Sequence, residues 1–363
     1  MRKTLLTGAS GYLGQKMLQQ MTLAGEQMLI PIRAESVTEF EKRRQKILNS
    51  LPEKSRQQVE VVHSDLSSLR EILKPRSNDI HRVIHNAAVT AFNVDEQTAN
   101  QVNRDGTLEM LRLARECSRL KQFLYVSTVY ASGMSAGVIE EKIFEPKPEF
   151  ANHYERSKWE SEQFLATEFA DVPWTIARVA TVIADDDSGH VIQQNAIHNT
   201  LKLFFYGLIS LLPGLKKTPI YLVQGDFVAK AIAEIAVKAK DKDIFHVCHD
   251  RQSAMTLERF IDLAYEEFMK EESFSSRRLL KPLFADEKSF ETLANNMKSF
   301  GGSVLSQGLA SVAPFGKQLF IEKDIRNEHL KSILPSYQKP EMETLIRKTC
   351  ATLAKTKFAK VDT

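Results

Sequence analysis

The chain has 363 residues, of which 43% are hydrophobic and 26% charged, and its net charge at pH 7 is +3. This length allows one large α/β domain and a smaller one, and the composition is that of a folded globular protein. The small net charge argues against a dedicated nucleic-acid-binding protein, in which basic residues gather in a domain or stripe. Three widely spaced cysteines, Cys117, Cys248 and Cys350, fit neither a disulfide framework nor a zinc site and indicate a reducing cytosol.

Targeting signals and membrane spans are not predicted. The first strand begins almost at Met1, which leaves no room for a signal peptide, and no run reaches the ~20 apolar residues of a membrane span. We therefore expect a cytoplasmic protein. The longest apolar run, Leu203 to Leu212, is either a buried helix or a surface that touches an apolar partner such as a membrane.

A glycine-rich turn follows the first predicted strand, with Gly8, Gly11 and Gly14 in the pattern Gly-x-x-Gly-x-x-Gly. Such a turn permits a tight bend, lets main-chain N–H groups approach a pyrophosphate, and lets the next helix pack closely on the strand. The helix N-terminus then offers a positive dipole end to the phosphates. On spacing alone, an ordinary glycine-containing turn explains the motif equally well.

Strand and helix patterns alternate along the first half of the chain, which is typical of a parallel sheet with crossover helices. The predicted strands are 3–7, 28–32, 59–63, 81–85, 122–126 and 174–177. Helical spacing predicts helices at 12–24 and 98–120. Farther on we expect a helix pair over 195–212 and a helix at 227–239 between short strands at 220–223 and 244–248. The remainder, from about residue 271, has an ambiguous helical pattern.

The second predicted strand ends at Arg33, where an acidic residue would normally bind the adenosine ribose of an unphosphorylated dinucleotide. A guanidinium there suits a 2′-phosphate, to which it can donate two charge-assisted hydrogen bonds. Arg43 is a candidate second cation. Asp65, after the third strand, could accept a hydrogen bond from the adenine amine. Solvated surface arginines, and a helix cap at Asp65, are the alternatives.

The residues Tyr154 and Lys158 are four apart on a predicted helix, so their side chains share one face. A nearby ammonium lowers the pKa of a phenol from about 10 and allows it to exchange a proton with a carbonyl oxygen near neutral pH. Thr128, at the end of the fifth strand, could hydrogen-bond to the same oxygen. The histidines lack metal-ligand spacing, and the run from Asp185 to Asp187 is interpreted as a solvated loop, so we predict no metal site.

Together, the glycine motif, Asn86-Ala87-Ala88, Ser127-Thr128 and Tyr154-x-x-x-Lys158 resemble the extended short-chain dehydrogenase/reductases over about residues 1–265. Segments 85–92, 150–160 and 178–189 resemble the fatty acyl reductase and thioester reductase branch of that superfamily. The chain departs from this branch at Val179, where proline is usual.

The resemblance implies a doubly wound parallel Rossmann sheet with a smaller substrate lobe and a mainly helical extension. We expect an NADP-binding domain at 1–183, a substrate-binding lobe at 184–270 that includes returning Rossmann elements, and the extension at 271–363. Thr128, Tyr154 and Lys158 would be catalytic, and Tyr154 and Lys158 would also bind the cofactor. The other expected cofactor contacts are Thr7, Gly8, Ser10, Gly11, Tyr12, Leu13, Gly14, Arg33, Arg43, Asp65, Leu66, Asn86, Ala87, Ala88, Asn103, Val179 and Thr181.

The implied reaction is the NADPH-dependent reduction of an acyl thioester, carried by coenzyme A or an acyl carrier protein, to an aldehyde or alcohol. The apolar run 203–212 would line an acyl channel, touch a membrane surface or simply pack in the core. Two alternatives stay open. One is another extended reductase that acts on a sugar nucleotide or a hydroxysteroid-like substrate, and the other is a non-catalytic protein that senses NADPH.

Overall fold

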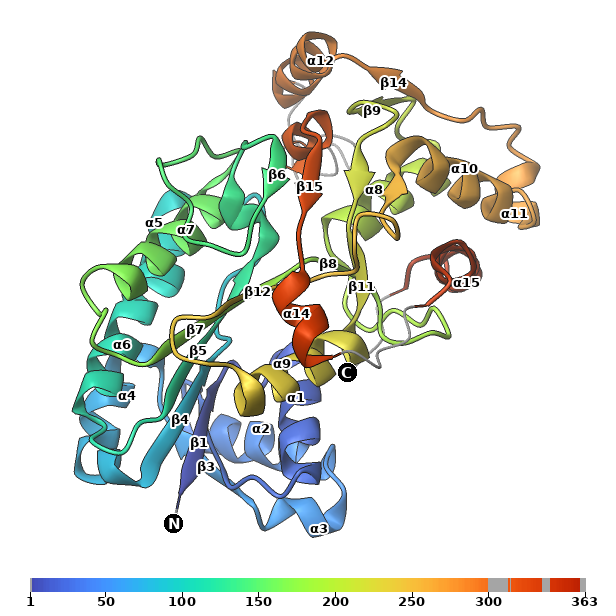
Figure 1. Cartoon of the computed structure of the whole chain (residues 1–363). Coiled ribbons are helices and arrows are strands. Elements are labelled where there is room, and N and C mark those ends of the chain that lie inside the picture. The colour runs from blue at the N-terminus through green and yellow to red at the C-terminus, as the bar shows by residue number, and fades with distance from the viewer. Residues whose placement is uncertain (1, 300–312, 314, 335–339, 360–363) are drawn as a thin grey trace.

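In the computed structural model, which describes residues 2–299, 313, 315–334 and 340–359, a seven-stranded parallel sheet forms the centre of the molecule (Figure 1). The strand order is β12-β7-β5-β4-β1-β2-β3. These strands are β1 (Lys3–Thr7), β2 (Met28–Ile32), β3 (Val59–His63), β4 (Ile80–His85), β5 (Gln122–Thr128), β7 (Trp174–Val179) and β12 (Ile244–Val247). The predicted doubly wound α/β fold is confirmed, and β1 to β3 have the predicted bounds.

Helices cover both faces of the sheet because successive strand residues point to opposite sides. Leu6 and Ile30 pack in one core with helices α1 (Tyr12–Leu23), α2 (Val37–Asn49) and α9 (Gly225–Lys238). Leu5 and Leu29 belong to a second core with α4 (Leu66–Leu73), α6 (Gly106–Glu116) and α7 (His153–Ala166). Figure 1 shows these two helical layers on either side of the strands. Short helix α3 (Glu53–Arg56) and the 3₁₀ segment η1 (Lys74–Asp79) complete this part.

The helix predicted at 98–120 is three segments in the structure: α5 (Glu96–Ala99), a π-helical segment η2 (Asn100–Asp105) and α6. The segment begins earlier than predicted because Asp95 caps it, accepting a hydrogen bond from the Thr98 N–H at 2.8 Å. The wide π-helical turn contains Asn103, whose side chain binds neighbouring segments, as described below. Sequence periodicity alone does not distinguish this turn from an α-helix.

The helix pair predicted at 195–212 is wrong in its second half. Helix α8 (Ala196–Phe205) ends in a Schellman motif, in which Gly207 has a φ of +71° and the N–H of Leu208 donates to the Leu203 carbonyl at 2.8 Å. The chain then forms strand β9 (Leu211–Pro213), which pairs with β14 (Leu283–Ala285).

A third core forms around α8 from later parts of the described chain and includes Leu201, Phe260 and Ile346. Helices predominate after residue 271, but strands from that region pair with earlier ones: β14 with β9, and β15 (Lys323–Ile325) with β6 (Gly137–Ile139). The further elements are β8 (Thr181–Ala184), β10 (Pro219–Ile220), β11 (Leu222–Gln224), β13 (Met255–Thr256), α10 (Leu257–Phe268), α11 (Glu272–Ser275), α12 (Glu287–Ser299), α14 (Glu328–Ile333), α15 (Met342–Lys355), and the 3₁₀ segments η3 (Val129–Ser132) and η4 (Lys317–Phe320).

The apolar run 203–212 belongs mainly to this third core. Leu203, Phe204, Phe205, Ile209 and Leu212 are all buried, whereas Tyr206 and Leu208 are partly exposed. Core packing, rather than an acyl channel or a membrane surface, therefore explains most of the run. Within the described residues, we find no helix with the length and apolar character that a membrane crossing requires.

Candidate active site

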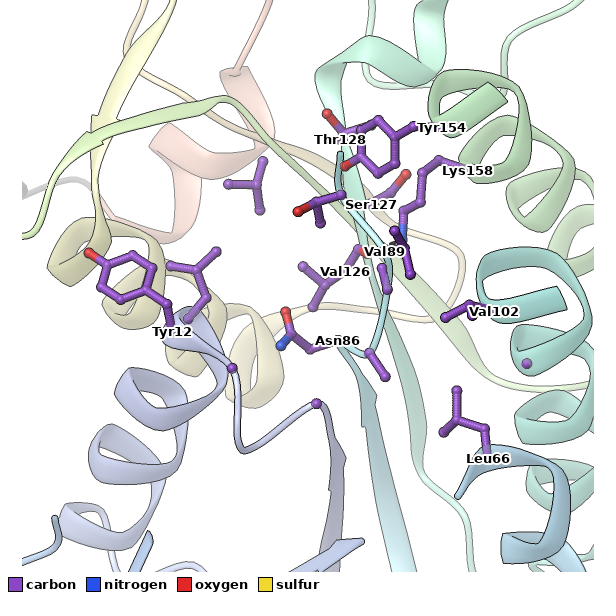
Figure 2. Close-up of a pocket in the computed structure, with 18 of the residues that line it drawn as sticks. Tyr12, Leu66, Asn86, Val89, Val102, Val126, Ser127, Thr128, Tyr154 and Lys158 are labelled. Carbon is purple, nitrogen blue, oxygen red and sulfur yellow. Dashed lines mark hydrogen bonds between the residues drawn. The ribbon is translucent and has the colours of Figure 1, made fainter. Parts of the chain in front are cut away.

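A cleft of about 1050 Å³ opens at the carboxyl ends of the central strands. The strand order reverses between β4 and β1, and ligands of open α/β sheets bind at such a switch point. Figure 2 shows Thr128, Tyr154 and Lys158 near one end of the cleft and Leu66 near the other. The predicted site residues that line it are Gly8, Ser10, Gly11, Tyr12, Leu13, Arg33, Asp65, Leu66, Asn86, Ala87, Ala88, Thr128, Tyr154, Lys158, Val179 and Thr181.

The glycine-rich turn forms one wall of the cleft and touches the loop after β4. Gly8 has a φ of +71°, and a Cβ there would lie 2.8 Å from the Ala87 nitrogen. Gly14 does not line the cleft; a Cβ there would lie 2.0 Å from the Gly8 carbonyl oxygen, so this glycine lets α1 pack against the turn. The first N–H groups of a helix lack partners within the helix, so the start of α1 can receive an anion.

Thr7 lies beneath this wall and supports it from the sheet. Its hydroxyl oxygen accepts hydrogen bonds from the N–H groups of Asn86 at 3.2 Å and Ala87 at 3.1 Å. It also lies 2.8 Å from Nδ1 of the buried His85. Thr7 is completely buried, so the structure gives it the role of holding the loop after β4 rather than the predicted cofactor contact.

Arg33 is exposed at the end of β2 and lines the cleft, but Arg43 does not. The Arg43 guanidinium donates to the Arg33 carbonyl at 3.0 Å and pairs with Glu39 at 2.5 Å. Asp65 lines the cleft and also caps α4, where its carboxylate accepts from the Ser68 N–H at 2.9 Å. That hydrogen bond is the largest cause of the lowered pKa of Asp65.

Tyr154, Thr128 and Lys158 come together at the other end of the cleft, and all three are buried. Burial raises the pKa of the Tyr154 phenol above its ordinary value, and a hydrogen bond with Thr128 opposes this rise. The Lys158 ammonium donates to the Val126 carbonyl at 2.7 Å, and burial lowers its pKa to about 7. Thr128 therefore limits the rise in the pKa of the phenol, while the Lys158 ammonium is hydrogen-bonded to the main chain.

Asn103 also lies outside the cleft, although it was predicted to contact the cofactor. From the π-helical turn, its side chain accepts from the Val89 N–H at 2.8 Å and donates to the Val89 carbonyl and the Ser157 hydroxyl, each at 3.0 Å. It therefore joins the loop after β4 to α7, the helix that carries Tyr154. A buried ion pair, Arg178 with Glu162 at 2.6 Å, braces α7 against β7.

Aromatic side chains that the sequence analysis left out of its site form an apolar wall beside Tyr154. The Phe92 ring centroid lies 5.6 Å from that of Tyr154, 5.5 Å from that of Tyr130 and 5.5 Å from that of Phe315. Phe92 appeared only within a resembling segment, and Tyr130 follows the predicted Thr128 closely. Phe315 comes from the part of the chain without a recognisable pattern, so no sequence signal identified it.

These residues fit a nicotinamide dinucleotide. A cleft whose wall is a glycine turn and a helix N-terminus suits a pyrophosphate. The arginine at one end and the Thr128–Tyr154–Lys158 group at the other suit the adenosine and nicotinamide ends. The fold and this site are those of an extended short-chain dehydrogenase/reductase, a class of oxidoreductases that use a nicotinamide cofactor.

Comparison with known proteins identifies the family to which the chain belongs within this class. Residues 6–232 match the family model described as male sterility protein. The chain is 30% identical over 141 residues to the NRPS-like oxidoreductase fscA of Fusarium equiseti, which covers 37% of this chain and 13% of that protein. It is 24% identical over 308 residues to carboxylic acid reductase of Mycobacterium marinum, which covers 72% of this chain and 25% of that one.

The match to the family model spans well over half of the chain, and the protein therefore belongs to the male sterility protein family. Its fold is similar to that of the terminal R domain from the myxalamid PKS-NRPS biosynthetic pathway. The TM-score is 0.75 at 20% identity, over 99% of this chain and 92% of that domain. The aligned regions span a quarter or less of the two curated relatives.

Proposed function

We propose that the protein reduces an acyl thioester with NADPH, releasing a thiol and an aldehyde. The observation that carries this proposal is the buried Thr128–Tyr154 hydroxyl pair, which lies at the nicotinamide end of the cleft against an apolar aromatic wall. Hydroxyls placed in this way can stabilise the oxygen of a carbonyl group, and the apolar wall suits an acyl chain. Kinship with proteins named as carboxylic acid and NRPS-like reductases supports the same substrate class.

The preference for NADPH rests on Arg33. Its guanidinium lines the cleft at the end of β2, where NAD-binding proteins place an acidic residue for the ribose hydroxyls. The N–H donors of a planar guanidinium can bind two oxygens of a 2′-phosphate at once. Asp65, the acidic side chain nearest in sequence that lines the cleft, is engaged as the cap of α4.

The cofactor, when bound, supplies the hydride that attacks the thioester carbon. Thr128 and Tyr154 would donate hydrogen bonds to the carbonyl oxygen and stabilise the negative charge that develops on it. Tyr154 would then transfer its phenolic proton to that oxygen. Lys158, one helical turn after Tyr154, would hold the nicotinamide ribose. As the carbon–sulfur bond breaks, the hydroxyl proton would pass to the sulfur, which would release the thiol and leave the aldehyde. A hydride from a second NADPH and a second proton from Tyr154 would yield the alcohol.

The test is to incubate the protein with NADPH and acyl thioesters, and to follow thiol release together with NADPH loss. We expect thiol and consumed NADPH in a ratio of one to one for an aldehyde product, or one to two for an alcohol. Tyr154→Phe, with its cofactor affinity retained, is the matched control. NADPH oxidation by ketones or sugar nucleotides, without thiol release from any thioester, would reject a thioester substrate and favour another extended reductase.

A further inference from the structure

A small apolar void lies next to the cleft, deep in the third core. It has a volume of about 20 Å³, roughly enough for one water-sized group. Its walls include Leu212, Phe260 and Ile261, all buried core residues. Among the described residues, Ile197 and Phe315 are the two that line both the void and the cleft. These two side chains therefore separate the void from the cleft.

The path from Tyr154 to the void runs along aromatic rings. Phe92 packs against both Tyr154 and Phe315, with its ring centroid 5.6 Å from that of the first and 5.5 Å from that of the second. Phe315 is only 4% exposed. A chain that leaves a carbonyl group at Tyr154 and follows Phe92 would thus meet the Phe315 ring before it reached the void.

A thioester joins an acyl chain to a thiol portion, here called the thiol arm. The polarity of each part decides which of them follows this path. The thiol arm of coenzyme A or of a carrier protein carries amides, whose burial without partners is costly. The void is lined by apolar side chains and by Thr200, whose hydroxyl donates to the Ala196 carbonyl, so it suits a hydrocarbon chain. The exposed Gln193 also lines the cleft and offers a polar group to the thiol arm.

We propose that Phe315 sets the length of the acyl group that the protein accepts. The acyl chain extends from Tyr154 along Phe92 and stops at the Phe315 ring, and the void behind that ring is reachable only when the ring is shortened. This inference rests on the proposed thioester reduction. It names the residue that determines chain-length specificity within that reaction.

The experiment measures kcat/KM for a series of straight-chain acyl thioesters with the wild-type protein, Phe315→Leu and Phe315→Ala. Each additional methylene that is buried should raise kcat/KM about fourfold, the equivalent of about 0.8 kcal/mol. We expect the wild-type values to rise and then fall at a short optimum. The optimum should move to longer chains in Phe315→Leu and farther in Phe315→Ala, with about a fifteenfold gain for a chain two carbons beyond the wild-type optimum.

Leu212→Ala is the matched control, because it enlarges the void and leaves Phe315 in place. We expect its chain-length optimum to equal that of the wild type. NADPH affinity and thermal melting show whether each variant is folded. If the wild type and both Phe315 variants turn over thioesters with the same chain-length optimum, the role of Phe315 is overturned and the proposed thioester reduction stands. Absence of thiol release from every thioester in the wild type would instead overturn the proposed function.

Discussion

Of the tyrosines that line the cleft, Tyr130 and Tyr154 both pack against Phe92, and we propose that only Tyr154 transfers a proton. Tyr154 is hydrogen-bonded to Thr128, whereas the hydroxyl of Tyr130 lies 2.8 Å from that of Thr181. Burial raises the pKa of Tyr130 to about 12 and that of Tyr154 also above its ordinary value. Both side chains are therefore neutral near pH 7. A neutral phenol beside an oxyanion is an acid, which is the role that the proposed reduction requires.

We predict that Tyr154→Phe lowers turnover about a hundredfold or more, the usual scale for a lost general acid, with NADPH affinity nearly unchanged. Tyr130→Phe should lower turnover less than about tenfold, because its hydroxyl binds Thr181. Steady-state kinetics and NADPH titration of both variants make the comparison. Equal losses in the two variants would remove the special role of Tyr154.

The choice between NADPH and NADH should depend on Arg33. Losing a charge-assisted pair with the 2′-phosphate costs about 1.5 to 3 kcal/mol, so Arg33→Ala should weaken NADPH binding roughly ten- to a hundredfold and leave NADH binding almost unchanged. Arg43→Ala is the matched control, since Arg43 is engaged by Glu39 and the Arg33 carbonyl. Dissociation constants for both cofactors decide the question, and equal values in the unmutated protein would contradict it.

At the scale of elements, strand β15 supports the segments that carry Thr128 and Tyr154. Lys323 on β15 is buried, and its ammonium donates to the Ser132 hydroxyl at 2.9 Å and the Gly133 carbonyl at 2.5 Å, just after the segment that follows Thr128. Burial lowers the pKa of Lys323, and the charge of the buried Glu155 opposes that effect. Glu155 is the residue after Tyr154 on α7. The Lys323 ammonium therefore interacts both with the segment after Thr128 and with the helix that carries Tyr154.

We predict that Lys323→Met destabilises the fold by about 1 to 3 kcal/mol, because it removes the buried hydrogen bonds to Ser132 and Gly133 and the positive charge that favours the ionised form of Glu155. The double variant Lys323→Met/Glu155→Gln should recover part of that loss, since the two residues interact. Lys317→Met, a half-exposed lysine of η4, should change stability by about 0.5 kcal/mol or less. Denaturant unfolding measures all three. Additive losses in the double variant would refute the coupling.

Elements with a local sequence pattern could be predicted, whereas pairings between distant parts of the chain could not. The bounds of β1, β2 and β3 followed from local patterns, because β1 and β2 are short apolar runs buried in the sheet and β3 is a valine-rich, half-buried edge strand. The pairing of β15 with β6 joins Lys323 to Gly137, which are far apart in sequence, and no local pattern encodes it. Strand β9 was mistaken for helix because an apolar run is compatible with either structure and the terminating Gly207 was overlooked.

Some residues of the candidate site could likewise be predicted from the sequence, and others could not. Gly8, Thr128 and Tyr154 follow strands or lie at fixed spacings, so the sequence predicted that they would meet at the carboxyl edge of the sheet, and they line one cleft. Thr7, Gly14 and Asn103 were also predicted to contact the cofactor but are buried and do not line the cleft, because position along the chain does not say which side of a turn or helix a residue occupies. Phe315 reaches the cleft only through the packing of the third core.

Three buried histidines make the stability of the whole molecule depend on pH. Burial lowers the pKa of His85 to about 3, of His198 to about 4 and of His246 to about 3. In each, one ring nitrogen lies within hydrogen-bond distance of an oxygen, at 3.1 Å from Thr107, 2.9 Å from the Ile183 carbonyl and 2.6 Å from the Arg326 carbonyl, respectively. The Thr107 hydroxyl donates to the Asn103 carbonyl, so it must accept from His85, which leaves the other nitrogen of that ring to accept from Thr7. A second proton on His85 would break that hydrogen bond.

We therefore predict that the protein loses stability as the pH falls below about 6.5. Between that value and pH 3 to 4 the unfolded chain binds protons that the folded histidines do not, so each histidine lowers the free energy of unfolding by about 1.4 kcal/mol per pH unit. Glu141 and Glu155, whose pKa values burial raises, oppose this trend. His85→Gln should reduce the slope by about 1.4 kcal/mol per unit, whereas the exposed His153→Gln should leave it unchanged. Denaturant unfolding at pH values from 7 to 4.5 measures the slopes. Identical slopes for the wild type and His85→Gln would show that His85 is not a source of the acid sensitivity.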